Sequence, residues 1–369
     1  MKKSKHHYVP KFYLKHFSSA TDRINVFLLQ SQYAIENVGL RHQCYRDKFY
    51  GQTEEIEEAI SRIESDAAPL INEIVCNSTL PDWRSSDHYL LLRFIALQSQ
   101  RTLRAAENLA SGFNGMRELV LEGRPRTSIT NVDLAQIDSG QAIFFLLAYL
   151  DKLTFLMSDM SIHLAINNTN SLFITSDNPL FRYNFYCEKI EGISTVGYAR
   201  RGLQLFLPIS PRHSVMLYDN KVYKYGKRDL NKTIIDNDQD VLTLNRFQLL
   251  NASKTILFSN WSYRDLLAKL SKSCGAHRKY MVPFVQELFS KDGKKGSSIL
   301  QISDRRPNLR LALSFLSTRR AASRVDMSRR ISLYRVSQEV LAEMTPKPPL
   351  PERVEQGLQG RTFRPRNTT

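Results

Sequence analysis

Residues 6–17 of this 369-residue chain read HHYVPKFYLKHF. The stretch holds three histidines and four aromatic residues within twelve positions. The first residues of a domain are usually poorly ordered unless contacts tie them to the core. Two adjacent histidines followed by an aromatic, apolar run therefore indicate a polar site anchored in a hydrophobic core. We expect the rest of the chain to be a scaffold for this site.

The chain downstream of this stretch predicts long helices. Hydrophobic residues recur at helical spacing over residues 53–75, although Pro69 would kink or split such a helix. A second long helix is expected over residues 88–104, with a continuation towards residue 122. Its start is apolar nearly all round, which is typical of a helix buried inside a domain. A third helix is expected over residues 131–155.

Strand-like segments dominate the second half of the chain. They cover residues 161–167, 171–176, 202–208, 214–218 and 256–258, with one earlier strand at 23–29 and one later helix that starts after residue 238. Helices first and strands later favour an α+β fold over an alternating parallel-sheet fold. We therefore expect a helix-rich N-terminal half whose long buried helices pack against a mostly antiparallel sheet.

The basic charge of the chain is concentrated near its end. The formal net charge is +16, which attracts polyanions such as nucleic acid or acidic lipid. Beyond residue 290 there are 17 Lys and Arg, 13 of them Arg, against 7 Asp and Glu. Because 42% of all residues are hydrophobic, the chain can bury a core. We expect a single globular α+β domain over residues 1–290 and a basic, Arg-rich, largely disordered tail over residues 291–369.

Two interpretations of residues 291–369 stay open. The segment could be a tail that binds nucleic acid through phosphates. It could equally be sequence appended by a gene rearrangement or a frameshift, because it shows no periodic core of its own. In the second case the charge argument for a nucleic-acid partner weakens.

Composition also bears on cofactors and on the compartment. The four cysteines are too far apart in sequence for a CxxC pair or a zinc ribbon, which fits reduced thiols in the cytosol. The longest apolar run, residues 142–150, is too short to cross a bilayer, and the charged first residues do not resemble a secretion signal. We expect a soluble, cytoplasmic protein with no membrane partner. The sequence has no P-loop or dinucleotide fingerprint, so no nucleotide cofactor is indicated.

The opening stretch resembles the start of the domain-of-unknown-function family 4238. Three more segments are similar to that family and come in its order: FIALQSQRT at 94–102, FITSDNP at 173–179 and LPISP at 207–211. The ordered set is far more specific than any one segment. The resemblance covers about residues 5–275 and leaves the tail uncovered. It implies a bacterial-type soluble domain and no established activity.

The adjacent pair His6 and His7 is the first candidate for a site. Histidine titrates near neutrality and ligates metals when neutral, so either ring could act as a general base, a metal ligand or a phosphate contact. Adjacent side chains of an extended segment point in opposite directions. One of the two histidines is therefore expected to face the site while the other packs. The alternative is that both are buried, hydrogen-bonded histidines that fix the N-terminus to the core.

Asp177 is the second candidate. It follows a predicted strand and precedes Asn178-Pro179, a common place for a catalytic or metal-binding carboxylate. With His7, it would hold a divalent metal ion if one is used. The alternative is an Asx-turn, in which the carboxylate bonds its own backbone.

Gln98 and Arg101 are three residues apart and so share one face of a buried helix. Arg101 has the forked donor geometry suited to phosphate or carboxylate. It could bind a substrate phosphate, or it could pair with Asp177 or Glu64 as an internal brace, and the brace is slightly favoured. Glu64 itself is expected on a solvated helix face.

Two functions from different classes fit these residues. The first is a hydrolase, and most specifically a phosphodiesterase or nuclease, with His6 or His7 as base or metal ligand, Asp177 as orienting or metal-binding acid, and Arg101 with Gln98 near the developing charge. The second is a non-catalytic module that binds nucleic acid or protein and uses these polar residues as a buried network. In the first case the candidate residues line one open pocket. In the second case they are closed off and satisfied by each other.

Overall fold

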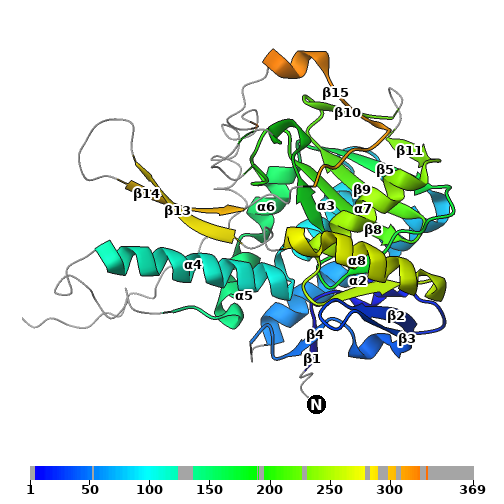
Figure 1. Cartoon of the computed structure of the whole chain (residues 1–369), viewed down its shortest axis with the longest axis horizontal. Helices are drawn as coiled ribbons and strands as arrows, with labels where there is room; N and C mark the ends of the chain where they lie inside the picture. The colour runs from blue at the N-terminus through cyan, green and yellow to red at the C-terminus, as the bar shows by residue number, and fades with distance from the viewer. Residues whose placement is uncertain are drawn as a thin grey trace, which may run out of the picture. The chain divides into compact units, whose positions relative to one another are not determined.

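The computed structural model describes residues 5–51, 54–123, 136–188, 190, 195–226, 231–278, 283–289, 298–304, 309–324 and 330. In these residues eight α-helices accompany mostly antiparallel sheets (Figure 1). The predicted α+β class is confirmed. The predicted disorder beyond residue 330 concerns residues outside the described part of the chain.

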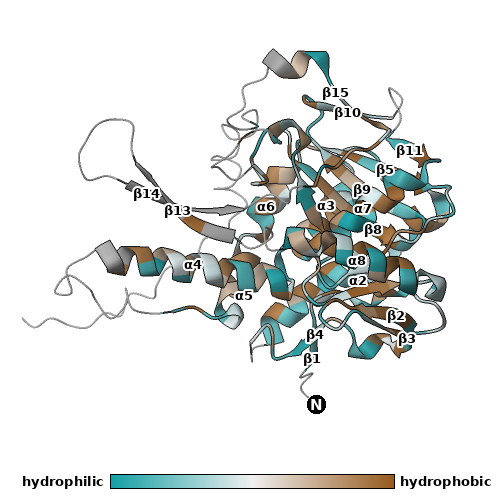
Figure 2. Cartoon of the chain, in the orientation of Figure 1, coloured by the Kyte–Doolittle hydropathy of each residue, from teal (hydrophilic) through white to brown (hydrophobic). Residues whose placement is uncertain are grey.

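The largest sheet has five strands in the order β11-β5-β9-β8-β7. Its strands are β5 (Ser161–Asn167), β7 (Phe181–Tyr183), β8 (Gln204–Ser210), β9 (His213–Tyr218) and β11 (Lys232–Ile235). Only β11 and β5 pair in parallel. Every residue of β8 is buried, and Figure 2 shows hydrophobic residues gathered in this central sheet.

A second sheet has four antiparallel strands in the order β3-β2-β12-β6. They are β2 (Arg23–Leu28), β3 (Tyr33–Gly39), β6 (Thr175–Ser176) and β12 (Thr255–Phe258). Three short pairs complete the strands of the described residues: β1 (Lys5–His7) with β4 (Tyr45–Asp47), β10 (Tyr223–Tyr225) with β15 (Leu316–Thr318), and β13 (Pro283–Phe289) with β14 (Ser298–Asp304).

The helices form the second component of the fold. They are α1 (Lys11–Lys15), α2 (Glu54–Asn77), α3 (Ser86–Gln100), α4 (Leu103–Gly123), α5 (Ser139–Ala148), α6 (Leu150–Met157), α7 (Asp238–Asn251) and α8 (Arg264–Arg278). Helix α2 continues through Pro69 as one element. The predicted long second helix is instead two helices, because α3 ends at Gln100 and α4 begins at Leu103.

The N-terminal stretch contacts the rest of the fold both before and after Pro10. Strand β1 pairs with β4, and α1 follows directly after Pro10. The side chains of Val9, Tyr13, Leu14 and Phe17 are fully buried. This burial stabilises the packing of residues 9–17 against the core, since their apolar surface is removed from water.

One further fact concerns the apolar helices. No single helix of the described residues is long and apolar enough to span a membrane, whereas α5 and α6 together reach that length and composition with a 53° bend between them. Part of their surface is exposed and aromatic, at Phe144, Phe145 and Tyr149.

The packed unit extends beyond the boundary expected from the sequence. It runs to Arg330, whereas the composition change predicted an end at residue 290. Leu311 and Leu313 are buried in the same hydrophobic cluster as β7 and α7 residues, and strand β15 pairs with β10. The composition change at Gly293 therefore does not coincide with the end of packed structure.

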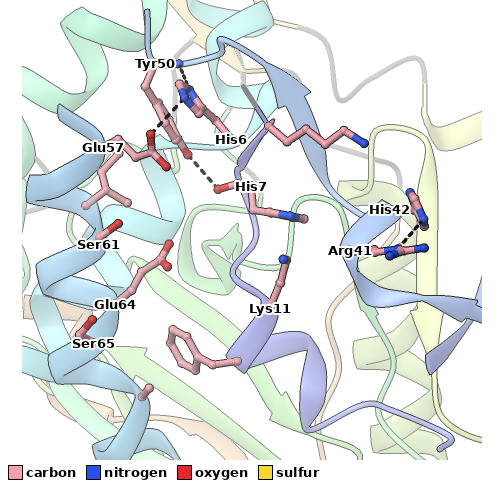
Figure 3. Close-up of a pocket in the computed structure, with 14 residues that line it drawn as sticks. His6, His7, Lys11, Arg41, His42, Tyr50, Glu57, Ser61, Glu64 and Ser65 are labelled. Atoms are coloured by element: carbon pink, nitrogen blue, oxygen red, sulfur yellow. Dashed lines mark hydrogen bonds and ion pairs between the residues drawn. The ribbon is translucent and has the colours of Figure 1, made fainter. Parts of the chain in front are cut away.

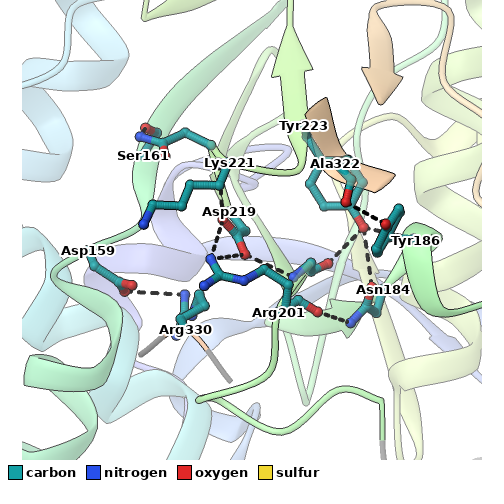
Figure 4. Close-up of polar contacts among 12 residues, drawn as sticks. Asp159, Ser161, Asn184, Tyr186, Arg201, Asp219, Lys221, Tyr223, Ala322 and Arg330 are labelled. Atoms are coloured by element: carbon teal, nitrogen blue, oxygen red, sulfur yellow. Dashed lines mark hydrogen bonds and ion pairs between the residues drawn. The ribbon is translucent and has the colours of Figure 1, made fainter. Parts of the chain in front are cut away.

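Arg330 is an anchor at the end of this unit. Its backbone N–H donates to Ala199 O (3.1 Å), its Nη2 donates to Leu156 O (2.7 Å), and its Nη1 lies 3.4 Å from Asp159 Oδ1. A second buried ion pair, Arg201 with Asp219, lies beside it in Figure 4. An unpaired charge is costly to bury, so the ion pair with Asp159 stabilises the buried position of Arg330.

Candidate functional site

A cavity of about 840 Å³ opens between the N-terminal stretch, η1 (Leu40–His42) and α2. Figure 3 shows α2 residues along one side of it, His7 and Lys11 in the middle, and the η1 residues on the other side. The lining residues are Lys5, His6, His7, Lys11, Phe12, Arg41, His42, Tyr50, Glu57, Ile60, Ser61, Glu64, Ser65 and Ala68.

The pairing of β1 with β4 places the two histidines in different environments. His6 lies opposite Arg46 and His7 lies opposite Tyr45, so the rings leave opposite faces of the strand. The His6 side chain is 5% exposed, whereas His7 is partly exposed. The alternation of side chains along the strand explains this difference.

Both ring nitrogens of His6 have partners. The backbone N–H of Tyr50 donates to Nδ1 (3.0 Å), so Nδ1 carries no proton. The proton then resides on Nε2, which lies 3.3 Å from Glu57 Oε2. The ring also stacks on Tyr50 with 5.3 Å between centroids. His6 therefore fixes β1 against α2 and has no free nitrogen for a substrate.

His7 has one fixed nitrogen and one open nitrogen. Its Nδ1 lies 3.0 Å from the carbonyl oxygen of Gln43, which can only accept, so Nδ1 carries the proton. Among the described residues Nε2 has no hydrogen-bond partner. Burial is the main cause that lowers the pKa of His7 below 6.5, and the positive charges of Lys11 and Arg101 lower it further. The ring is therefore neutral at pH 7, with a free lone pair on Nε2.

The cavity has one basic and one acidic side. Lys5, Lys11 and Arg41 belong to the basic side, and the Lys5 ammonium lies 4.8 Å from the centroid of Tyr45. On the acidic side, Glu57 and Glu64 come from α2. Both of these carboxylates already have cationic or N–H partners, namely His6 and Arg101. The basic side is thus the one available to an anionic ligand.

Arg101 lies behind Glu64 and is completely buried. Its Nη1 is ion-paired with Glu64 Oε1, and its Nε donates to Gln98 Oε1 (3.2 Å). Gln98 in turn donates from Nε2 to the carbonyl oxygen of Tyr8 (3.2 Å). This is the brace arrangement with Glu64 as partner, and neither Arg101 nor Gln98 lines the cavity. Glu64 lies on an ion-paired face rather than on a fully solvated one.

Asp177 lies outside the cavity lining and is 3% exposed. Its carboxylate accepts three backbone N–H groups, from Ser253 (2.7 Å), Lys254 (2.7 Å) and Thr255 (3.2 Å). Burial raises the pKa of Asp177, and these hydrogen bonds oppose the rise. The carboxylate therefore holds the connection between α7 and β12.

The structure does not assemble the predicted metal pair of His7 and Asp177 into a metal-binding group. Among the described residues, no group of three or more His, Cys, Asp or Glu side chains is arranged to hold a metal ion. The Asp177 carboxylate is bonded to backbone N–H groups and lies outside the cavity that His7 lines.

Comparison with known proteins gives one match. The sequence profile of the family described as "Protein of unknown function (DUF4238)" matches residues 5–262. The chain belongs to the DUF4238 family. No curated protein and no solved structure matches the chain.

The part that matches DUF4238 contains every residue that lines the cavity. It ends before α8 and before the segment anchored by Arg330. The four motifs that resemble the family meet in the core, because Tyr13 bonds Thr175 and Pro208 while Gln98 bonds Tyr8. The motifs that resemble DUF4238 thus mostly form a network of buried contacts in the core.

Several residues that line the cavity were not predicted from the sequence. Lys11, Arg41 and Glu57 line the cavity but are not among the predicted site residues, although Lys11 lies in the HHYVPKFYLKHF stretch. A signal for the acidic side exists, because Glu57, Ser61 and Glu64 recur at helical spacing on α2. No local signal indicates that this stripe faces β1, since the two segments are about fifty residues apart.

Proposed function

We propose that the chain is a phosphodiesterase that acts on nucleic acid, with His7 as the general base. The observation that carries the proposal is the state of the His7 ring. Its Nδ1–H is fixed by the Gln43 carbonyl, its Nε2 is open in a cavity of about 840 Å³, and its lowered pKa keeps it neutral at pH 7. A base must be unprotonated and correctly oriented before it can accept a proton.

The basic side of the cavity supports a phosphodiester as the substrate. Lys5, Lys11 and Arg41 line the same cavity as His7 and offer positive charge to a phosphate and to the charge that develops on it. The net charge of +16 also favours association with polyanions. His7 then accepts the proton of the attacking hydroxyl, and the cations stabilise the transition state.

Arg101 and Gln98 have positioning roles in this proposal. Arg101 holds Glu64 at the edge of the cavity, and Gln98 holds both Arg101 and the Tyr8 backbone that follows His7. His6 fixes β1 to α2 through Tyr50 and Glu57. These residues keep the His7 ring in place without touching the substrate.

A non-catalytic module is the second candidate function. The observation that favours it is that Gln98, Arg101 and Asp177 are buried and bonded to protein groups instead of lining the cavity. In that case the cavity binds a phosphate-containing ligand, and no bond of the ligand breaks.

The test is incubation of the purified full chain with single- and double-stranded DNA and RNA, with Mg²⁺, with Mn²⁺ and with chelator. The critical variant is His7→Asn, which keeps an N–H donor for Gln43 and removes the basic nitrogen. We expect cleavage by the parent chain and a loss of about 100-fold or more in the folded variant. Binding without cleavage by the parent chain would favour the module instead.

A further inference from the structure

The cavity offers a base and cations, but the two carboxylates that line it, Glu57 and Glu64, are already paired with protein groups. Enzymes that cleave DNA with water commonly use two metal ions held by carboxylates to stabilise both the attacking and the leaving oxygen. Here Glu57 is bonded to His6, Glu64 is ion-paired with Arg101, and Lys11 lies close enough to lower the pKa of His7. This donor set suits an anion beside His7 better than a divalent cation.

We infer that the substrate is single-stranded RNA and that the attacking group is the 2′-hydroxyl of the RNA itself. The inference rests on the proposed function of His7 as general base. A nucleophile in the same nucleotide has an effective molarity of about 10⁵ M or more, so a single base and a nearby cation suffice. DNA has no such hydroxyl.

The reaction balances without a metal ion or another reactant. The 2′-hydroxyl gives its proton to His7 Nε2 while the 2′-oxygen forms a bond to phosphorus. The bond from phosphorus to the 5′-oxygen breaks, and that oxygen takes a proton from the Lys11 ammonium. The products are a 2′,3′-cyclic phosphate and a 5′-hydroxyl. His7 then returns its proton to solvent and Lys11 regains one from solvent, so both groups recover their initial states.

The position of Lys11 fits this role. It is the first residue of α1, is exposed, and lines the cavity with His7, beside which it lies in Figure 3. Its charge acts directly on the His7 ring, because it lowers the pKa of that ring. An ammonium at this place both neutralises the phosphate and can protonate the leaving oxygen.

The far side of the cavity favours unpaired bases. Arg41 and His42 are exposed on η1, and Arg41 Nε donates to His42 Nε2 (2.9 Å). This bond holds a guanidinium and an imidazole next to each other at the cavity. Proteins that bind single-stranded RNA use such planar groups to stack against bases that are free of a partner strand.

The experiment uses three labelled oligonucleotides of one sequence, incubated with the full chain in the presence of chelator. The first is all DNA, the second has one ribonucleotide, and the third has a 2′-O-methyl group at that ribonucleotide. We expect cleavage only of the second, directly after the ribonucleotide, to give a 2′,3′-cyclic phosphate detected by mass spectrometry. We expect His7→Asn, purified in parallel, to lower this rate about 100-fold or more.

The outcomes separate the two proposals. Cleavage of the all-DNA or 2′-O-methyl strand at a similar rate would overturn the 2′-hydroxyl mechanism while the phosphodiesterase proposal stands. Products that carry a 5′-phosphate would do the same. A chain that cleaves none of the three strands, nor long RNA or DNA with Mg²⁺ or Mn²⁺, would overturn both proposals.

Discussion

The hydroxyl of Tyr13 lies 2.8 Å from the hydroxyl of Thr175, although 162 positions separate the two residues in the sequence. The same Tyr13 hydroxyl donates to the carbonyl of Pro208. A parallel contact joins Thr102 Oγ1 to Asn178 Oδ1 (2.8 Å). Four segments that are distant in sequence therefore meet in the core, and the Tyr13 bonds hold the N-terminal stretch against both larger sheets.

The first prediction concerns Tyr13→Phe. The ring is fully buried, so the substitution keeps its packing and removes only the hydroxyl. The partners at Thr175 and Pro208 then lose a buried hydrogen bond, which costs about 1 to 3 kcal/mol of unfolding free energy. Urea unfolding measures this loss. Tyr33→Phe is the matched control. Tyr33 is 64% exposed, so the loss of its hydroxyl should not change the free energy of unfolding measurably. Equal unfolding midpoints of the two variants would contradict the prediction.

The second prediction concerns the end of the packed unit. A chain cut after residue 290 loses Leu311 and Leu313 from the core and leaves Asp240 without its hydrogen bonds from Ser314. We expect it to unfold at a clearly lower urea concentration than a chain cut after Arg330. A single substitution within the full chain gives the same information, because Leu311→Ala should cost about 2 to 5 kcal/mol. Unchanged stability in both cases would show that residues 309–330 do not contribute to the core.

The third prediction concerns stability in acid. His163 is fully buried on β5, its Nε2 lies 2.7 Å from Thr233 Oγ1, and burial lowers its pKa to about 4. In the unfolded chain this histidine has the ordinary pKa of about 6.5, so the unfolded chain binds a proton at a higher pH than the folded chain does. The contribution of His163 to the free energy of unfolding is therefore fully present above pH 6.5. It decreases by about 3 kcal/mol as the pH falls towards 4. Urea unfolding at pH 7 and pH 4.5 should show a smaller acid loss for His163→Gln than for the parent. Parallel losses would refute the role of His163.

The sequence predicted the elements of this fold better than the contacts between them. Hydrophobic spacing located α2, and strand-like composition located β2, β5, β8 and β9, because both are local properties of the sequence. The partners of Tyr13 and Asp177 could not be predicted, since they come from segments brought together only by sheet pairing. The composition did not predict that packing extends to Arg330. The few apolar residues near Leu311 belong to a hydrophobic cluster whose other members come from distant segments.

The same difference between local patterns and distant contacts applies to the candidate site. The pair His6 and His7 was a candidate because of its residue type and its place in an extended segment, and both residues line the cavity. Asp177 was chosen on equally local grounds, yet its carboxylate serves three backbone N–H groups of a distant connection. Local sequence can propose a reactive group, but burial and pairing decide whether that group faces a cavity.

The fourth prediction compares two lysines of α1. Lys11 lines the cavity, whereas Lys15 is exposed on the same short helix and pairs with Asp22 (3.5 Å). Lys11→Ala should lower the cleavage rate about 100-fold, since it removes both a phosphate contact and the proposed proton donor. Lys15→Ala changes the net charge equally and should leave the rate within about twofold. Similar losses in both variants would mean that only net charge matters.

The fifth prediction concerns the pH profile of cleavage. Because His7 must be unprotonated to act as a base, kcat/KM should fall as the pH drops through the His7 pKa, which burial lowers from its usual value. Lys11 lowers this pKa and Glu64 raises it. Lys11→Ala should therefore move the acidic limb to higher pH, and Glu64→Gln should move it to lower pH, whatever each does to the maximal rate. Opposite shifts in the two variants would not follow from a purely structural role of Lys11 and Glu64. An acidic limb that stays at the same pH in both variants would show that a group other than His7 titrates.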